Sequence, residues 1–159
     1  MGDLMSSQWL DVASASTSAT LQQECPMCGF ALFTPIAKLR VSHAGLYDDA
    51  RFPGRLIVSL DTHFEHFDQV DPVVLAQFMA DLQTASVVLR KMGGVDRVNV
   101  AVLGNKDPHV HAHVIPRRLS DANFGVAPWE GAAPHCTLDP AVRVALIERL
   151  RQGFDEIGS

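Results

Sequence analysis

The sequence predicts an α+β fold in which helices pack on one side of an antiparallel sheet. Short β-branched apolar runs predict strands, and two longer segments with apolar residues at helical spacing predict helices. Along the chain the order is strands, helix, strands, helix, which favours this architecture. With 159 residues, of which 47% are hydrophobic, the chain suits one compact domain with a buried core.

We expect residues 1–24 to be a flexible N-terminal arm and residues 25–159 to form the single domain. The arm is rich in Ser, Ala and Thr and shows no sustained hydrophobic period. Within the domain, residues 38–47 can be extended, and the turn-rich stretch DDARFPGR follows them. Residues 55–60, RLIVSL, form a short β-branched apolar run that is typical of a buried strand.

The clearest helix follows this strand. Asp71 can cap it, Pro72 fits its first turn and Gly93-Gly94 can end it. A second helix is expected to open at Asp139-Pro140. Each helix carries an apolar stripe: Leu75, Phe78, Met79, Leu82, Leu89 and Met92 in the first, and Leu146, Ile147, Leu150, Phe154 and Ile157 in the second.

Two further strands are expected between the helices. Residues 97–104, RVNVAVLG, predict one strand, and the stretch PHVHAHVIPRR predicts the next. The gap NKDP between them has the size of a hairpin loop, so the two strands should pair antiparallel.

Bulk composition excludes some classes of function. A formal net charge of −5 argues against binding of extended nucleic acid, which needs a basic field. No apolar run approaches the length of a membrane span, and the first residues do not resemble a signal peptide, so we expect a cytoplasmic protein without a membrane partner. The three cysteines, an odd number, agree with a reducing compartment.

The main functional signal is the row His109, His111 and His113 at every second position of an apolar run. Three readings compete: strand histidines with local hydrogen bonds only, a metal site, or acid–base and nucleophilic chemistry by imidazole. The preceding LGNKDP turn can present backbone amides, and Arg117 and Arg118 follow the row. Amides and cations around imidazoles suit an anionic substrate such as a phosphate.

The stretch HVHAHVI resembles the signature of the histidine-triad (HIT) superfamily of nucleotide hydrolases and transferases, His-φ-His-φ-His-φ-φ with φ apolar. The resemblance extends from about residue 25 to residue 118, and the tail NFGVAPWEGAAPHC is similar to a bacterial branch loosely labelled as diadenosine-tetraphosphate-hydrolase-like. It implies a five-stranded antiparallel sheet with two main helices, usually as a homodimer. The apolar helix stripes and RVNVAVLG point to a dimer as well, because a thin monomer would not easily bury them.

The resemblance also implies roles for individual residues. His111 would be the nucleophile that attacks an α-phosphorus and forms a nucleotidyl-histidine, and His113 would stabilise the phosphate and help the leaving group depart. Candidates for binding the substrate are Asn99 and Asn105 at the phosphates and Asp48 or Asp49 at the ribose. The chain departs from the family pattern with Gly104-Asn105 in place of Gly-Gln and with Arg55 where a histidine often follows the Pro-Gly turn.

A second motif, ECPMCG, spaces Cys25 and Cys28 as in a zinc knuckle, a redox pair or two idle thiols. Some HIT proteins resemble this arrangement and bind structural zinc through two cysteines, a distant histidine and the first histidine of the row. By that comparison the ligands would be Cys25, Cys28, His63 and His109. The remaining candidates, His43, His66, His135 and Cys136, are expected at the surface or in packing.

Together these observations predict a nucleotide hydrolase or nucleotidyltransferase that acts on dinucleoside polyphosphates or nucleotide phosphoramidates. One alternative is a metal-binding module in which the whole histidine row ligates an ion. Another is a nucleotide-binding protein that retains the pocket without catalysis.

Overall fold

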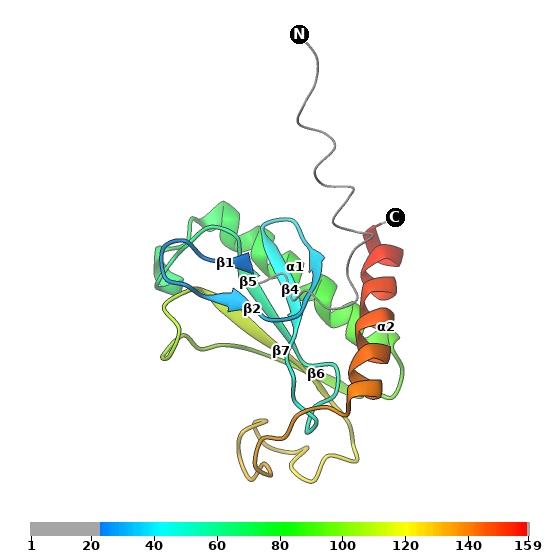
Figure 1. The fold of residues 1–159 in the computed structure, drawn as a ribbon. Helices are drawn as coiled ribbons and strands as arrows, with labels where there is room; N and C mark the ends of the chain where they lie inside the picture. The colour runs from blue at the N-terminus through cyan, green and yellow to red at the C-terminus, as the bar shows by residue number, and fades with distance from the viewer. Residues whose placement is uncertain (1–22, 159) are drawn as a thin grey trace.

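The computed structural model, which describes residues 23–158, contains a five-stranded antiparallel sheet with the strand order β3-β4-β5-β7-β6 (Figure 1). The sheet strands are β3 (Pro35–Lys38), β4 (Ser42–Leu46), β5 (Leu56–Leu60), β6 (Arg97–Val102) and β7 (His111–Arg117). A separate small hairpin pairs β1 (Gln23–Glu24) with β2 (Ala31–Leu32). The helices are α1 (Pro72–Lys91), α2 (Pro140–Gly158) and the 3-10 turn η1 (Phe67–Gln69). The predicted fold class, with its five-stranded sheet and two main helices, is confirmed.

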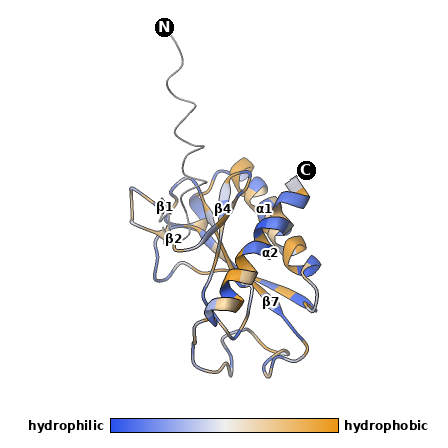
Figure 2. Cartoon of the chain, turned by 45° about the vertical axis from the view of Figure 1, so that its right-hand side comes forward, coloured by the Kyte–Doolittle hydropathy of each residue, from blue (hydrophilic) through white to orange (hydrophobic). Residues whose placement is uncertain are grey.

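The hydrophobic core lies between the two long helices and one face of the sheet. Alternate residues of the strands point into it, because successive side chains of a strand face opposite sides. In Figure 2 hydrophobic and hydrophilic residues alternate along the helices, as amphipathic helices require. The fully buried core side chains include Ala44, Leu56, Val58, Phe78, Ala85, Ala112, Val114 and Leu150. This packing leaves the opposite face of the sheet available for a site.

The first helix has the ends that the sequence predicts. The Asp71 carboxylate accepts hydrogen bonds from the amides of Val73 (2.8 Å) and Val74 (3.3 Å), which α1 would otherwise leave unpaired. Gly93 and Gly94 follow the helix with φ angles of 82° and 67°, a left-handed conformation that glycine adopts at little cost.

The expectation that no apolar run approaches the length of a membrane span does not hold for α1. By length and hydropathy alone this helix could cross a membrane. Its side chains Phe78, Leu82, Ala85, Val88 and Leu89 are instead buried in the core between the sheet and α2. The two helices approach closely where Gly153 meets Val88, and an added Cβ there would lie 2.9 Å from the valine. We therefore interpret α1 as the core helix of this domain.

The extended segment expected over residues 38–47 contains the last residue of β3, a tight turn over residues 39–41 and the whole of β4. Asp81, a buried carboxylate on α1, accepts hydrogen bonds from the amides of Arg40 (3.1 Å) and Val41 (3.0 Å) and from the Ser42 hydroxyl (2.7 Å). This turn is stabilised by a residue far away in the sequence, so no local signal marks it.

Two boundaries differ from the sequence expectation. The last two residues of the predicted arm over residues 1–24, Gln23 and Glu24, form strand β1. Residues 1–22 lie outside the described part of the chain. The connection between β6 and β7 spans residues 103–110, so His109 precedes the strand that carries His111 and His113. The predicted antiparallel pairing of β6 with β7 is confirmed.

Candidate active site and metal centre

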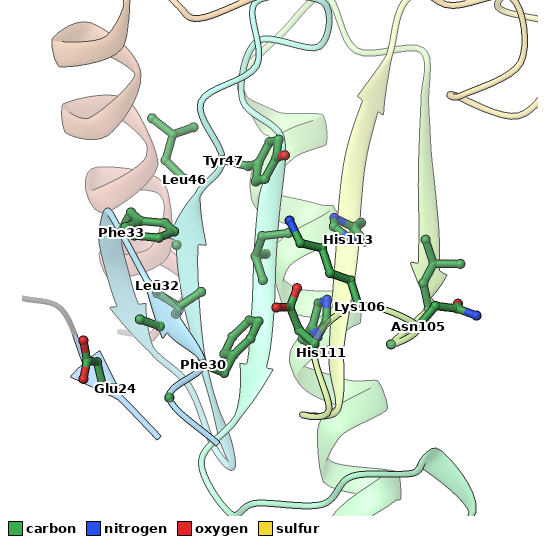
Figure 3. Close-up of a pocket in the computed structure, with 17 residues that line it drawn as sticks. Glu24, Phe30, Leu32, Phe33, Leu46, Tyr47, Asn105, Lys106, His111 and His113 are labelled. Atoms are coloured by element: carbon green, nitrogen blue, oxygen red, sulfur yellow. The ribbon is translucent and has the colours of Figure 1, made fainter. Parts of the chain in front are cut away.

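A cavity of about 560 Å³ lies over the open face of the sheet, on the side away from the helices (Figure 3). Its floor includes His111 and His113 of β7 and Ile57 of β5, which face the same side because Ile57 pairs directly with His113. The walls come from the β1–β2 hairpin, from the end of β4, and from the loop between β6 and β7: Glu24, Phe30, Leu32, Phe33, Leu46, Tyr47, Asn105, Lys106 and Asp107. The volume and the mixture of aromatic and polar groups suit a small organic anion.

His111 lies buried in the floor of this cavity with a defined tautomer. Its Nδ1 is 2.7 Å from the main-chain carbonyl oxygen of His109. Since a carbonyl oxygen only accepts, Nδ1 must carry the proton, and in the neutral ring Nε2 then holds a free electron pair. The Phe30 ring stacks on the imidazole, with ring centroids 4.8 Å apart. This arrangement leaves Nε2 chemically able to act as a nucleophile.

His113 has a different environment on the same face. Its ring meets that of His111 nearly edge-on, with centroids 5.4 Å apart. An Arg55 guanidinium nitrogen lies 3.0 Å from its Nδ1. Burial, with the nearby charges of Arg55 and His111, lowers the pKa of His113 to about 4. The ring is therefore uncharged at neutral pH.

The four residues proposed as metal ligands come together at the edge of the cavity. The ligand atoms of Cys25, Cys28, His63 and His109 all lie within 4.8 Å of one another. Cys25 Sγ is 3.6 Å from His63 Nδ1, and Cys28 Sγ is 3.6 Å from His109 Nδ1. Two thiols and two imidazoles are the kind of donor set with which proteins bind zinc in tetrahedral coordination.

The outer contacts of His109 support a ligand role. Its Nε2–H donates to the carbonyl oxygen of Leu60 at 2.7 Å, which leaves the Nδ1 electron pair directed toward the cysteines. Burial lowers the pKa of His109, and this favours the neutral ring that a metal requires. His111 and His113 are outside this group of ligand atoms, so the geometry does not support an ion held by the whole histidine row.

The cysteine turn also shapes the cavity. Within it the Gly29 amide donates to the Cys25 carbonyl at 2.8 Å, and Gly29 has a φ of 75°. The turn leads directly into Phe30, whose ring stacks on His109 as well as on His111, with centroids 5.1 Å and 4.8 Å apart. A metal bound by the cysteines would thus hold Phe30 against the nucleophile candidate.

The candidates for substrate binding divide into two groups. Asn105 lines the cavity. Asn99 does not, and its Oδ1 accepts a hydrogen bond from the buried Arg117 at 2.9 Å. The Asp49 carboxylate is fully buried and accepts from Arg51 and Arg55, while Asp48 accepts from the Leu138 amide at 2.7 Å. Both aspartates have internal partners, and their ribose-binding role stays a prediction.

Phe30, Tyr47 and Lys106 are the most informative of the cavity residues that the sequence did not predict. Phe30 follows the Cys-x-x-Cys-Gly motif directly, which was the available signal. Tyr47 lies just beyond β4 and packs edge-on to His113, with centroids 6.2 Å apart. Lys106 lies in the LGNKDP turn, for which the sequence predicts backbone amide donors and not the lysine side chain.

The fold and this site define a class: small α+β proteins with a histidine-lined cavity on the open face of an antiparallel sheet. The HIT domain family model matches residues 36–120, and the chain belongs to this family. An uncharacterised HIT-like protein from Methanocaldococcus jannaschii is 32% identical over 75 residues, which cover 45% of this chain. The match spans 58% of that relative, a little over half of its length.

Solved structures with this fold include a histidine triad protein from Bradyrhizobium japonicum, which has a TM-score of 0.68 and 28% identity over 76% of this chain and 89% of that one. A zinc-bound histidine triad family protein from Mycobacterium smegmatis has a TM-score of 0.61 and 21% identity, covering 78% and 85%. Plasmodium falciparum diadenosine triphosphate hydrolase has a TM-score of 0.56 and 12% identity, covering 89% and 88%. At these identities the last two similarities show the fold alone.

Proposed function

We propose that the protein is a nucleotide hydrolase or nucleotidyltransferase that acts at an α-phosphate through His111. The observation that carries this proposal is the 2.7 Å hydrogen bond from His111 Nδ1–H to the His109 carbonyl, which leaves Nε2 as the nucleophile. Family membership supports a nucleotide substrate in general. A nucleotide-binding protein without catalysis would not need this tautomer.

In the first step Nε2 attacks the α-phosphorus, a P–N bond forms, and the P–O or P–N bond to the leaving group breaks. The leaving group departs with the bonding electrons and takes a proton from solvent where it needs one. In the second step water attacks the phosphorus, the P–N bond breaks, and one water proton passes to solvent. A second phosphate in place of water would give transfer instead of hydrolysis.

Polar groups of the loop between β6 and β7 are placed to hold the phosphates. Asn105 and Lys106 line the cavity together with the imidazoles, and Lys106 supplies a positive charge. The aromatic side chains Phe30, Phe33 and Tyr47 offer apolar surface on the opposite wall for a base. The cavity thus has a polar and an aromatic side (Figure 3), as a nucleotide requires.

The direct test compares wild type with His111→Asn, using diadenosine tetraphosphate and AMP-morpholidate as substrates. We expect loss of turnover by at least a thousandfold, as on removal of other covalent nucleophiles, with an unchanged thermal unfolding midpoint. Ser59→Ala, on the neighbouring strand directly beside His111, is a matched control that keeps the imidazole. Turnover by His111→Asn within tenfold of wild type would contradict the covalent mechanism.

We propose that Cys25, Cys28, His63 and His109 hold a structural zinc ion. The support is the compact set of ligand atoms within 4.8 Å and the Leu60 carbonyl that orients His109. Four protein ligands leave no open position, so a bound ion would supply rigidity and no chemistry to the reaction.

We also propose a homodimer formed through the outward face of α1. The apolar side chains Val73, Met79 and Val87 of α1 are exposed by 68%, 51% and 39%, and the domain does not cover them. Light scattering should give twice the monomer mass for wild type and the monomer mass for Met79→Glu. A monomeric wild type at micromolar concentration would contradict this proposal.

A further inference from the structure

Arg55 occupies the position where the HIT resemblance leads us to expect a histidine. Its guanidinium contacts three groups of the fold. One guanidinium nitrogen donates to the Asp49 carboxylate at 2.8 Å, and another lies 3.0 Å from His113 Nδ1. The guanidinium also stacks over the Tyr47 ring, 4.3 Å from its centroid. Its side chain is only 14% exposed and is not among the residues that line the cavity. Arg55 therefore contacts the site through His113 and Tyr47, and His113 is the one of the two that can accept a hydrogen bond at a ring nitrogen.

This contact fixes the tautomer of His113. A guanidinium has only donors and stays protonated, so the nitrogen that faces it has to accept. His113 Nδ1 is then unprotonated, and in the neutral ring the proton must be on Nε2. His113 lines the cavity, and this Nε2–H is the one hydrogen bond that its ring can donate there.

We propose that Arg55, held by Asp49, is a positioning residue that keeps His113 as a neutral Nε2–H donor to a substrate phosphate. The inference rests on the function proposed above, because the phosphate is the group that His113 would contact. In this arrangement His113 stabilises charge on the phosphate by a hydrogen bond and does not act as an acid. Protonating its Nδ1 would place two cationic groups in contact.

The groups around His113 agree with this assignment. Burial is the main cause that lowers the pKa of His113, and Arg55 and the neighbouring His111 act in the same direction. Tyr47 packs on it edge-on, and Lys106 and Asp107 line the same cavity from the loop between β6 and β7. Asp49 lies behind Arg55 and directs the guanidinium rather than facing the imidazole.

A consequence is a preference among substrates. A polyphosphate leaves as a stable anion, whereas the amine of a phosphoramidate must gain a proton before the P–N bond breaks. Without an acid at His113, this site favours dinucleoside polyphosphates over nucleotide phosphoramidates. The substrate class that we infer is therefore the dinucleoside polyphosphates.

The test uses the full-length protein with ¹⁵N-labelled histidine and long-range ¹H–¹⁵N spectra at pH 7. His113, assigned with His113→Asn, should show an unprotonated Nδ1 and a protonated Nε2 that shifts when AMP is added. In Arg55→Gln, Nδ1 should gain a proton in part of the molecules. The control Arg51→Gln removes another partner of Asp49 that makes no contact with His113, and it should keep the wild-type pattern.

Kinetics complete the test. Arg55→Gln should lower kcat for diadenosine tetraphosphate on the order of a hundredfold, with KM changed less, as for other losses of a placed donor or its tautomer. The wild type should prefer diadenosine tetraphosphate over AMP-morpholidate in kcat/KM. A protonated Nδ1 in wild type, an unshifted Nε2 with AMP, or wild-type kcat in Arg55→Gln would each overturn the inference. An inactive wild type would instead contradict the proposed function, and the nitrogen spectra would still decide the tautomer.

Discussion

His109 and His113 lie on either side of His111 in the sequence, yet their rings make opposite hydrogen bonds. The His109 ring is buried and the His113 ring is half-buried, and burial lowers the pKa of each. His109 donates from Nε2 to the Leu60 carbonyl and directs Nδ1 at the cysteines, whereas His113 accepts at Nδ1 from Arg55. Between them His111 donates from Nδ1 to a carbonyl and keeps Nε2 free. The second partner of each ring, more than its place in the row, determines its chemistry.

The largest effect on stability should come from removing a ligand of the proposed zinc site to which His109 belongs. Cys25→Ser removes a ligand of the proposed zinc site and should lower the free energy of unfolding by several kcal/mol, about the scale of a structural metal ligand. His111 keeps its own hydrogen bond, so part of the activity should survive in the folded fraction. Denaturant titration, with metal analysis of protein purified without chelators, measures this.

Cys136→Ser is the matched control, because Cys136 is exposed and lies outside the cluster. It should retain wild-type stability and metal content. Stoichiometric zinc in Cys25→Ser, or no zinc in wild type, would contradict the assignment of the four ligands.

The lowered pKa of His113 predicts that the free energy of unfolding depends on pH. The pKa of His113 is about 4 in the folded protein, below the 6.5 of an ordinary histidine, so the unfolded chain binds the proton more tightly. The contribution of the neutral His113 ring to the free energy of unfolding is complete above pH 6.5 and is lost as the pH falls toward 4. Between pH 8 and pH 5 this loss should be about 2 kcal/mol.

Urea unfolding at pH 8 and pH 5 measures this term. His113→Asn should reduce the loss between the two pH values, and the difference between the proteins isolates His113 from the other titrating groups. An identical pH dependence in wild type and variant would contradict a depressed pKa at this residue.

The smallest effect is expected for Phe30, whose ring contacts both His109 of the proposed zinc site and His111 of the cavity. Phe30→Ala removes the ring that stacks on His109 and His111 and forms part of the cavity wall. We expect KM to rise about fivefold, from the loss of about 1 kcal/mol of aromatic stacking, with a smaller change in kcat. Steady-state kinetics on diadenosine tetraphosphate measure this, and Phe33→Ala tests whether the outer aromatic wall matters equally. An unchanged KM in Phe30→Ala would show that the hairpin does not shape the binding site.

The sequence predicted the parts of this account that depend on local pattern. The caps of α1, the apolar stripes and the pairing of β6 with β7 follow from short-range spacing. The grouping of Cys25 and Cys28 with His63 and His109 came from a family resemblance, because those segments are distant in the chain.

The partners that set the histidine states could not be predicted. The Asp81 contacts to the turn between β3 and β4, and the contact of Arg55 with His113, join residues on different elements. A period-two pattern placed His109 in the same strand as His111, but the chain bends before β7, where His109 is directed toward the cysteines and the Leu60 carbonyl. Such contacts depend on the packed fold, and no spacing rule encodes them.

The central claim is that His111, and not its neighbours, forms a bond to phosphorus. The most direct measurement is a rapid acid-free quench of wild type during turnover of diadenosine tetraphosphate labelled at the α-phosphate, followed by peptide mapping. We expect a nucleotidyl group, labile to acid, on the peptide that contains residues 109–117, absent in His111→Asn and present in Cys25→Ser. Turnover without any labelled peptide, or label on His113 in the His111→Asn protein, would contradict the account.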